Sequence, residues 1–205
     1  WITPQMCVLF QAGMSERRRF IDRLTSSLDS LHLNRVYKYE KLLRQRSKIL
    51  MQLKSDKAWL DTIESQISEL SVSITASRLE MVEALNDLYN KELNDNYLID
   101  NFPPADIKLT GKIEELLTNK PASEVEGYIK DNLKKSRFSE EENIFGPNKT
   151  IIEILNRKNN KNVNYASTGE QKLLLISIIL SHARMLNKNF NMAPILLLDD
   201  IVEHL

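Results

Sequence analysis

Two segments near the carboxyl end of the chain carry the residues best suited to nucleotide chemistry. In the first, the apolar run 194–198 is followed by the paired acids Asp199 and Asp200. Four consecutive bulky apolar residues predict a strand buried on both faces, and the acids would then emerge at the sheet edge where open α/β folds place ligands. One carboxylate can hold Mg²⁺ and the other can orient or deprotonate an attacking water. The alternative is a buried strand that ends in a solvated acidic turn.

The second segment, residues 167–172, reads Ser-Thr-Gly-Glu-Gln-Lys and opens a run of apolar residues at helical spacing. The Ser167 hydroxyl and the next backbone N–H groups would lie at a helix N-terminus, which is a natural phosphate site. The alternative is an ordinary capping box made by Ser167 and Glu170. A helix opened by Ser-x-Gly-x-Gln and followed by an apolar strand with two acids resembles the signature motif and Walker B strand of ABC-type ATPases.

Further segments make the resemblance more specific. Residues 1–6, 15–24 and 39–50 are similar to the middle of the bacterial RecF family, whose members are recombinational-repair ATPases related to SMC-type heads. Residues 166–172 and 194–205 are similar to the carboxyl-terminal motifs of that family. The resemblance implies an α/β fold with a large helical insertion: a partial ABC-ATPase head, with signature helix and Walker B strand, and an antiparallel helical lever arm.

The resemblance also implies a chemistry in which two heads sandwich ATP and Mg²⁺ between them. On that basis Asp199 holds Mg²⁺, Asp200 is the catalytic carboxylate and Gln5 is a Q-loop candidate. The positions that match the signature, which contacts the nucleotide of the opposite subunit, are Ser167, Thr168, Gly169, Glu170, Gln171 and Lys172. The implied function is ATP-dependent homodimerisation on DNA at single-strand gaps or duplex junctions, working with RecO and RecR to load RecA.

Two departures from the family pattern bear on activity. No G-x-x-x-x-G-K-[ST] phosphate loop occurs, and the chain holds 5 glycines. We therefore expect an internal fragment that lies after the phosphate loop and is inactive alone, while its parent is a weak ATPase. Residues 146–150 read Gly-Pro-Asn-Lys-Thr where the family carries Gly-Pro-His-Arg-Asp, so a phosphate or DNA role for that loop does not transfer.

A long helical insertion separates the two ends. Apolar residues at alternating three- and four-residue steps predict a helix over about 57–94 with a coiled-coil stripe, and residues 34–53 supply an antiparallel partner. The stripe positions are Leu60, Ile63, Ile67, Leu70, Ile74, Met81, Ala84 and Leu88. The expected division is head 1–30, arm 31–102 and carboxyl-terminal lobe 103–205. The alternative for the arm is a four-helix bundle with one core.

Basic residues give little support for nucleic acid at the level of the whole chain. Lys and Arg number 28, as do Asp and Glu, so any DNA affinity must come from local patches. In the triplet 17–19, three successive arginines on one helix point about 100° apart, so we expect two of the three to be solvated or paired. The single Cys7 cannot form an internal disulfide, and no apolar stretch predicts a membrane span, which favours a cytoplasmic protein with no membrane partner.

Two other functions remain open from the sequence. A structural SMC-type head would share every site residue and differ mainly in the length of its arm. A non-enzymatic coiled-coil interaction module would explain the long helices but would leave Ser167, Asp199 and Asp200 without a task.

Overall fold

The computed structural model describes residues 9–51, 56–92, 102–138, 146–191 and 194–197. The chain divides into two compact units, and each is described by itself. The sheet unit comprises Trp1–Leu28, Glu80–Leu109 and Ile151–Leu205, and the helical unit comprises Asp29–Leu79 and Thr110–Thr150.

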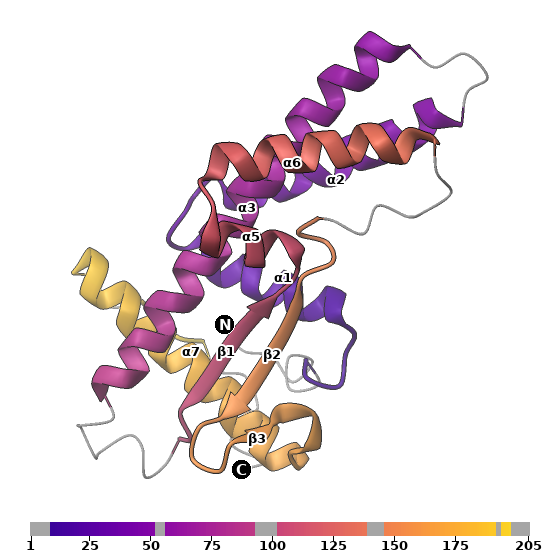
Figure 1. The fold of residues 1–205 in the computed structure, drawn as a ribbon. Helices are drawn as coiled ribbons and strands as arrows, with labels where there is room; N and C mark the ends of the chain where they lie inside the picture. Colours follow the sequence, from indigo (N-terminus) through magenta and orange to yellow (C-terminus); the bar gives the residue numbers. More distant parts are fainter. Residues whose placement is uncertain (1–8, 52–55, 93–101, 139–145, 192–193, 198–205) are drawn as a thin grey trace. The chain divides into compact units, whose positions relative to one another are not determined.

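Among the residues that the structure describes, the sheet unit holds three strands, in the order β1-β2-β3 (Figure 1). Its elements are α1 (Met14–Ser26), β1 (Ala105–Thr110), β2 (Ile151–Asn156), β3 (Lys161–Asn162), the short η3 (Val163–Tyr165) and α7 (Thr168–Phe190). Strands β2 and β3 pair antiparallel, with Leu155 opposite Asn162. The arrows of β1 and β2 also run in opposite directions.

Alternating burial explains the two longer strands. In β1, Ala105, Ile107 and Leu109 are buried while Lys108 is exposed, which is the period-two alternation of a strand covered on one face. In β2, Ile152 and Ile154 are buried, and helix α1 packs against this strand.

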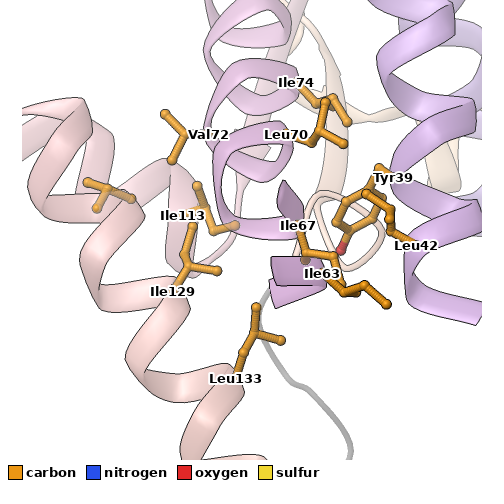
Figure 2. Packing of buried hydrophobic residues seen from close by; sticks show 11 residues of the cluster. Tyr39, Leu42, Ile63, Ile67, Leu70, Val72, Ile74, Ile113, Ile129 and Leu133 are labelled. Carbon is orange, nitrogen blue, oxygen red and sulfur yellow. The ribbon is translucent and has the colours of Figure 1, made fainter. Parts of the chain in front are cut away.

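The helical unit packs four helices around one core. They are α2 (His32–Leu50), the part of α3 (Lys57–Glu92) up to residue 79, α5 (Lys112–Asn119) and α6 (Ala122–Lys135), with the short η2 (Ser136–Phe138) after α6. The cluster of buried side chains consists of Tyr39, Leu42, Ile63, Ile67, Leu70, Val72, Ile74, Ile113, Val125, Ile129 and Leu133. Figure 2 shows Tyr39 and Leu42 on one side of α3 and Ile113 and Ile129 on the other.

Helix α3 follows the predicted stripe as far as Met81 and then departs from it. The predicted positions Leu60, Ile63, Ile67, Leu70, Ile74 and Met81 are buried, whereas further along the deeply buried residues are Leu85 and Tyr89. Ala84 and Leu88, which the pattern predicted to be central, are only half buried. A straight α-helix drifts by about 20° per heptad relative to a strict seven-residue repeat, and from residue 80 the helix belongs to the sheet unit, where its neighbours differ.

An ion cluster lies within the helical unit. Arg46 Nε donates to Glu64 Oε1 at 2.9 Å, Arg137 Nε donates to the same oxygen at 3.0 Å, and the Glu64 side chain is fully buried. Arg46 also donates to the Leu133 carbonyl at 2.6 Å. Because a buried carboxylate is costly without partners, this cluster fixes how α2, α3 and α6 meet.

The predicted fold class, an α/β chain with a large helical insertion, is confirmed. The antiparallel α2–α3 pair is present, and α5 and α6 share its core. The α2–α3 pair alone would leave apolar side chains exposed, and α5 and α6 cover them. By contacts, residues 80–109 group with the sheet unit and 110–150 with the helical unit. The division into head 1–30, arm 31–102 and carboxyl-terminal lobe 103–205 stays a prediction. In the described part of the chain, no helix is both long and apolar enough to cross a bilayer.

Candidate functional site

The first turn of α7 forms the capping box that was the alternative reading of residues 167–170. Ser167 is the N-cap, with an extended backbone, and its Oγ accepts a hydrogen bond from the Glu170 N–H at 3.3 Å. Glu170 Oε2 in turn accepts from the Ser167 N–H at 2.6 Å. Each side chain satisfies a backbone donor of the other residue, so the turn is rigid before any ligand arrives.

The capping box leaves a set of unused donors on the surface. Ser167, Thr168 and Gly169 are exposed. The Thr168 and Gly169 N–H groups have no hydrogen-bond partner among the residues that the structure describes. The Ser167 Oγ accepts from the Glu170 N–H and its hydroxyl also hydrogen-bonds the Glu170 carboxylate, so the unused donors of this turn are the two backbone N–H groups. These donors sit at the positive end of a 23-residue helix.

Gln171 anchors this turn from the inside. Its side chain is buried, and its amide nitrogen donates to the Val163 carbonyl at 3.0 Å and to the Ala166 carbonyl at 3.2 Å. The loop before α7 is therefore fastened to the helix that it opens. Of the signature positions, Gln171 holds the loop in place, while Lys172 is half buried.

Glu170 places a negative charge beside the unused donors, and Lys161 of β3 balances it. The Lys161 ammonium lies 3.4 Å from Glu170 Oε2. The hydrogen bond from the Ser167 backbone lowers the pKa of the Glu170 carboxyl, and the Ser167 hydroxyl and Lys161 act in the same direction. Glu170 therefore stays ionised and keeps its bond to the Ser167 N–H at neutral pH.

Arg17 is a site residue that sequence reasoning did not single out. Its guanidinium is buried and donates to the Phe10 carbonyl at 2.5 Å, to Asn164 Oδ1 at 2.5 Å and to the Ile152 carbonyl at 3.4 Å. None of these partners is a carboxylate. Burial lowers the pKa of this arginine, yet a guanidinium remains charged in proteins, so Arg17 adds a positive charge behind the loop.

The arginines of the triplet 17–19 point in different directions, as their spacing on a helix predicts. Arg19 is exposed and pairs with Glu16 of the same helix at 2.5 Å, while Arg17 points inward. Only packing decides which of three adjacent arginines is buried, because each presents a different face of the helix.

The acidic pair lies outside the part of the chain that the structure describes, as does Gln5. The predicted strand before the acids is not formed over 194–197, where no strand is assigned and Ile195 is 89% exposed. A strand depends on ladder hydrogen bonds to a neighbour, and none of the described strands supplies them here. Residues Pro194, Ile195 and Leu196 instead line a pocket of about 310 Å³ together with side chains of α1 and α7.

The described part of the site suits the anionic end of a nucleotide. It brings the Thr168 and Gly169 N–H donors together, with Ser167, Glu170 and Gln171 holding them in place. Among the described residues, no group of three His, Cys, Asp or Glu side chains converges as metal ligands. The arrangement can bind phosphate oxygens but holds no described residue placed to activate water.

Comparisons with known proteins identify relatives of this chain. No protein-family model matches the chain. It is 38% identical over 208 aligned residues to the DNA replication and repair protein RecF of Mesorhizobium japonicum, and 36% identical to RecF of Brucella abortus. Both alignments cover 100% of this chain, but 54% and 53% of the relatives. The chain thus spans about half the length of the curated relatives it matches.

Two solved structures share the fold. Both are described as the recombination mediator protein RecF in the RecFOR pathway, one as RecF-ATPrS and one as RecF-ATP. The first aligns with a TM-score of 0.76 over 97% of this chain and 54% of its own, and the second with 0.74 over 100% and 55%. Sequence identity is 21% in each case.

Proposed function

This chain is a homologue of the RecF proteins over its full length, and we propose that it supplies the signature half of an ABC-type ATPase in recombinational DNA repair. The proposed assembly is a dimer that closes on ATP. In it, Ser167 and the N–H groups of Thr168 and Gly169 contact the terminal phosphate of a nucleotide held by the opposite subunit.

The observation that carries this proposal is that the fold does not require a glycine at position 169. Gly169 occupies the first turn of α7, and a Cβ placed there would meet no atom of the described residues within 4 Å beyond its own helix backbone and chain neighbours. Its backbone is not in the left-handed region that favours glycine. The fold does not call for a glycine at this exposed point, nor at the equally open Gly127 of α6, but Gly169 lies beside N–H groups without a partner among the described residues. A residue without a side chain there lets a ligand approach those groups closely.

The remaining chemistry is proposed from the resemblance and from residue type. Asp199 would hold Mg²⁺, which supplies charge neutralisation at the phosphates, and Asp200 would orient the attacking water. Gln5 stays a Q-loop candidate. DNA at gaps or junctions, RecO and RecR are the proposed partners, and dimerisation is the step that couples nucleotide to DNA.

Adding one methyl group at Gly169 tests whether the proposed ATP-dependent dimer forms through this turn. In the whole protein, we expect Gly169→Ala to leave the fold as stable as before or slightly more stable, because alanine is the better helix former by up to about 1 kcal/mol. We expect the same change to abolish the ATP-dependent dimer, because the added Cβ occupies the space into which the phosphate must come. Sedimentation with ATP and Mg²⁺ measures the dimer, and thermal melts measure stability.

Gly127→Ala is the matched control. Gly127 also lies in a helix, α6, and its Cβ would likewise meet no atom of the described residues within 4 Å beyond its own helix backbone and chain neighbours. This variant should dimerise as the unmodified protein does. Normal dimerisation of Gly169→Ala would mean that the turn is only a helix cap, which is also what a coiled-coil interaction module would show.

A further inference from the structure

One face of helix α2 carries a positive stripe that the ATPase chemistry does not use. Helix α2 holds six Lys and Arg residues against one acid, Glu40. Arg35 is paired with Asp29, and Arg46 is buried against Glu64. The other four, Lys38, Lys41, Arg44 and Lys48, are exposed, and we refer to them as the basic stripe.

The spacing of the basic stripe places it on a single side of the helix. Steps of three, three and four residues keep the four cations within an arc of about 120°, on the side opposite the buried Tyr39, Leu42 and Arg46. The residues between them on that face, Asn34, Tyr37 and Gln45, are neutral. Glu40 lies at the edge of the arc and pairs weakly with Arg44 at 3.7 Å.

Three of these cations have no partner in the protein that the structure describes. No ion pair or hydrogen bond joins Lys38, Lys41 or Lys48 to a described residue. Since the whole chain has zero formal net charge, the basic stripe is a local excess that an external anion can neutralise.

We propose that the basic stripe of α2 binds the phosphate backbone of duplex DNA without reading its sequence. This inference rests on the proposed repair function and adds a surface to it. From Lys38 to Lys48 the stripe runs about 15 Å along the helix, a length over which duplex DNA presents about nine phosphate charges. A rigid row of exposed lysines suits such a repeating polyanion, and the high charge density of a duplex gives a larger release of counterions per contact than a single strand does.

The test measures how binding depends on salt. The 205-residue chain and its variants are titrated onto a fluorescent 25-base-pair duplex without nucleotide, at several salt concentrations between about 50 and 200 mM. The stripe variant is Lys38→Gln with Lys41→Gln and Lys48→Gln. We expect its affinity to fall about tenfold or more and the slope of log K against log salt to shrink by about 2.7, or 0.9 for each lost phosphate contact.

A matched variant separates the stripe from net charge. Lys120→Gln with Lys134→Gln and Lys135→Gln removes the same charge from exposed lysines elsewhere in the helical unit. It should keep the slope of the unmodified chain, and circular dichroism melts should show both variants folded. An unchanged slope in the stripe variant, or an equal loss in the matched variant, would overturn the proposal.

Two further outcomes are informative. If the chain does not bind the duplex but binds polyglutamate through the same lysines, the partner of the basic stripe is an acidic protein and the proposal is overturned. Because nucleotide is absent, this result is independent of the Gly169→Ala test. Loss of the DNA-binding proposal would not affect the proposal of ATP-dependent dimerisation, and loss of the dimer proposal would not affect DNA binding by the basic stripe.

Discussion

Arg17 shows how a single buried charge can organise the surroundings of a binding loop. Its guanidinium joins three segments far apart in the sequence, through the carbonyls of Phe10 and Ile152 and the side chain of Asn164. Asn164 belongs to the short η3 turn that leads into the capping box. The position of the unused donors therefore depends on an arginine that does not touch the ligand.

Replacing Arg17 should lower the free energy of unfolding more than replacing an exposed arginine of the same helix. Arg17→Met keeps the aliphatic length but leaves buried acceptors without a donor, for which we expect a loss of about 2 to 3 kcal/mol in the free energy of unfolding. Arg19→Met, on the exposed side of the same helix, should change it by less than about 1 kcal/mol. Urea unfolding measures both, and equal losses would show that the inward contacts of Arg17 carry no special weight.

His182 makes the sheet unit sensitive to acid. Its Nε2 lies 3.1 Å from the Leu24 carbonyl and 2.8 Å from Ser27 Oγ, and burial lowers its pKa below the ordinary 6.5. The unfolded chain therefore takes up this proton at higher pH than the folded chain does. The stability contributed by neutral His182 is complete above about pH 6.5 and is lost as the pH falls through the folded pKa.

The corresponding measurement compares two pH profiles. Between about pH 7 and 5 the free energy of unfolding should fall more steeply for the unmodified chain than for His182→Gln, which cannot titrate. Parallel profiles would assign the acid sensitivity to other groups.

At the scale of elements, the helices and strands that could be predicted are those with a clear period of their own. Helix α3 spans Lys57–Glu92 where a helix over about 57–94 was predicted, and α2 spans His32–Leu50 where residues 34–53 were predicted to be its partner. The eight-residue α5 and the two-residue β3 could not be predicted, because such short elements are held by packing and pairing rather than by pattern.

The candidate site was predictable to a similar degree. Ser167 and Glu170 could be placed at a helix start from residue type and spacing alone. The sequence contains no signal that selects Arg17 from its neighbours or shows that Gln171 turns inward, because both depend on which segments fold against α7. The strand over 194–198 was predicted from its apolar run, yet its described residues lack a pairing neighbour.

The burial of α3 between α2 and the α5–α6 pair supports a prediction about its core. Leu70 is 8% exposed within the cluster of Figure 2, and Glu69 next to it is exposed. We expect Leu70→Asp to cost several kcal/mol, about 3 or more, because it buries a charge without a partner. Glu69→Lys should be nearly neutral. Thermal melts compare the two, and small equal losses would contradict the packing around Leu70.

At the scale of the molecule, the proposed signature loop of this chain is not accompanied by a phosphate-loop motif in the 205-residue sequence. In such ATPases the loop amides and lysine make most phosphate contacts, while Asp199 and Asp200 offer only negative charge to a polyanion. Tight ATP binding would thus require the phosphate loop of one subunit and the signature loop of another to contact the same nucleotide.

The 205-residue chain by itself should therefore neither bind ATP tightly nor hydrolyse it. Isothermal titration with ATP and Mg²⁺ should give no saturable binding at micromolar concentrations. The whole protein serves as the positive control. Stoichiometric binding by the chain alone would contradict the division of labour between two subunits.

The capping box of α7 also provides a built-in reporter for ligand approach. The Ser167 amide is held by Glu170, whereas the next two amides have no acceptor among the described residues. Amide hydrogen exchange should accordingly be slow at 167 and fast at 168 and 169. When a phosphate takes up those two donors, their exchange slows while that of Ser167 stays as it was. Three consecutive amides thus distinguish an occupied turn from an empty one, without a label, in solution.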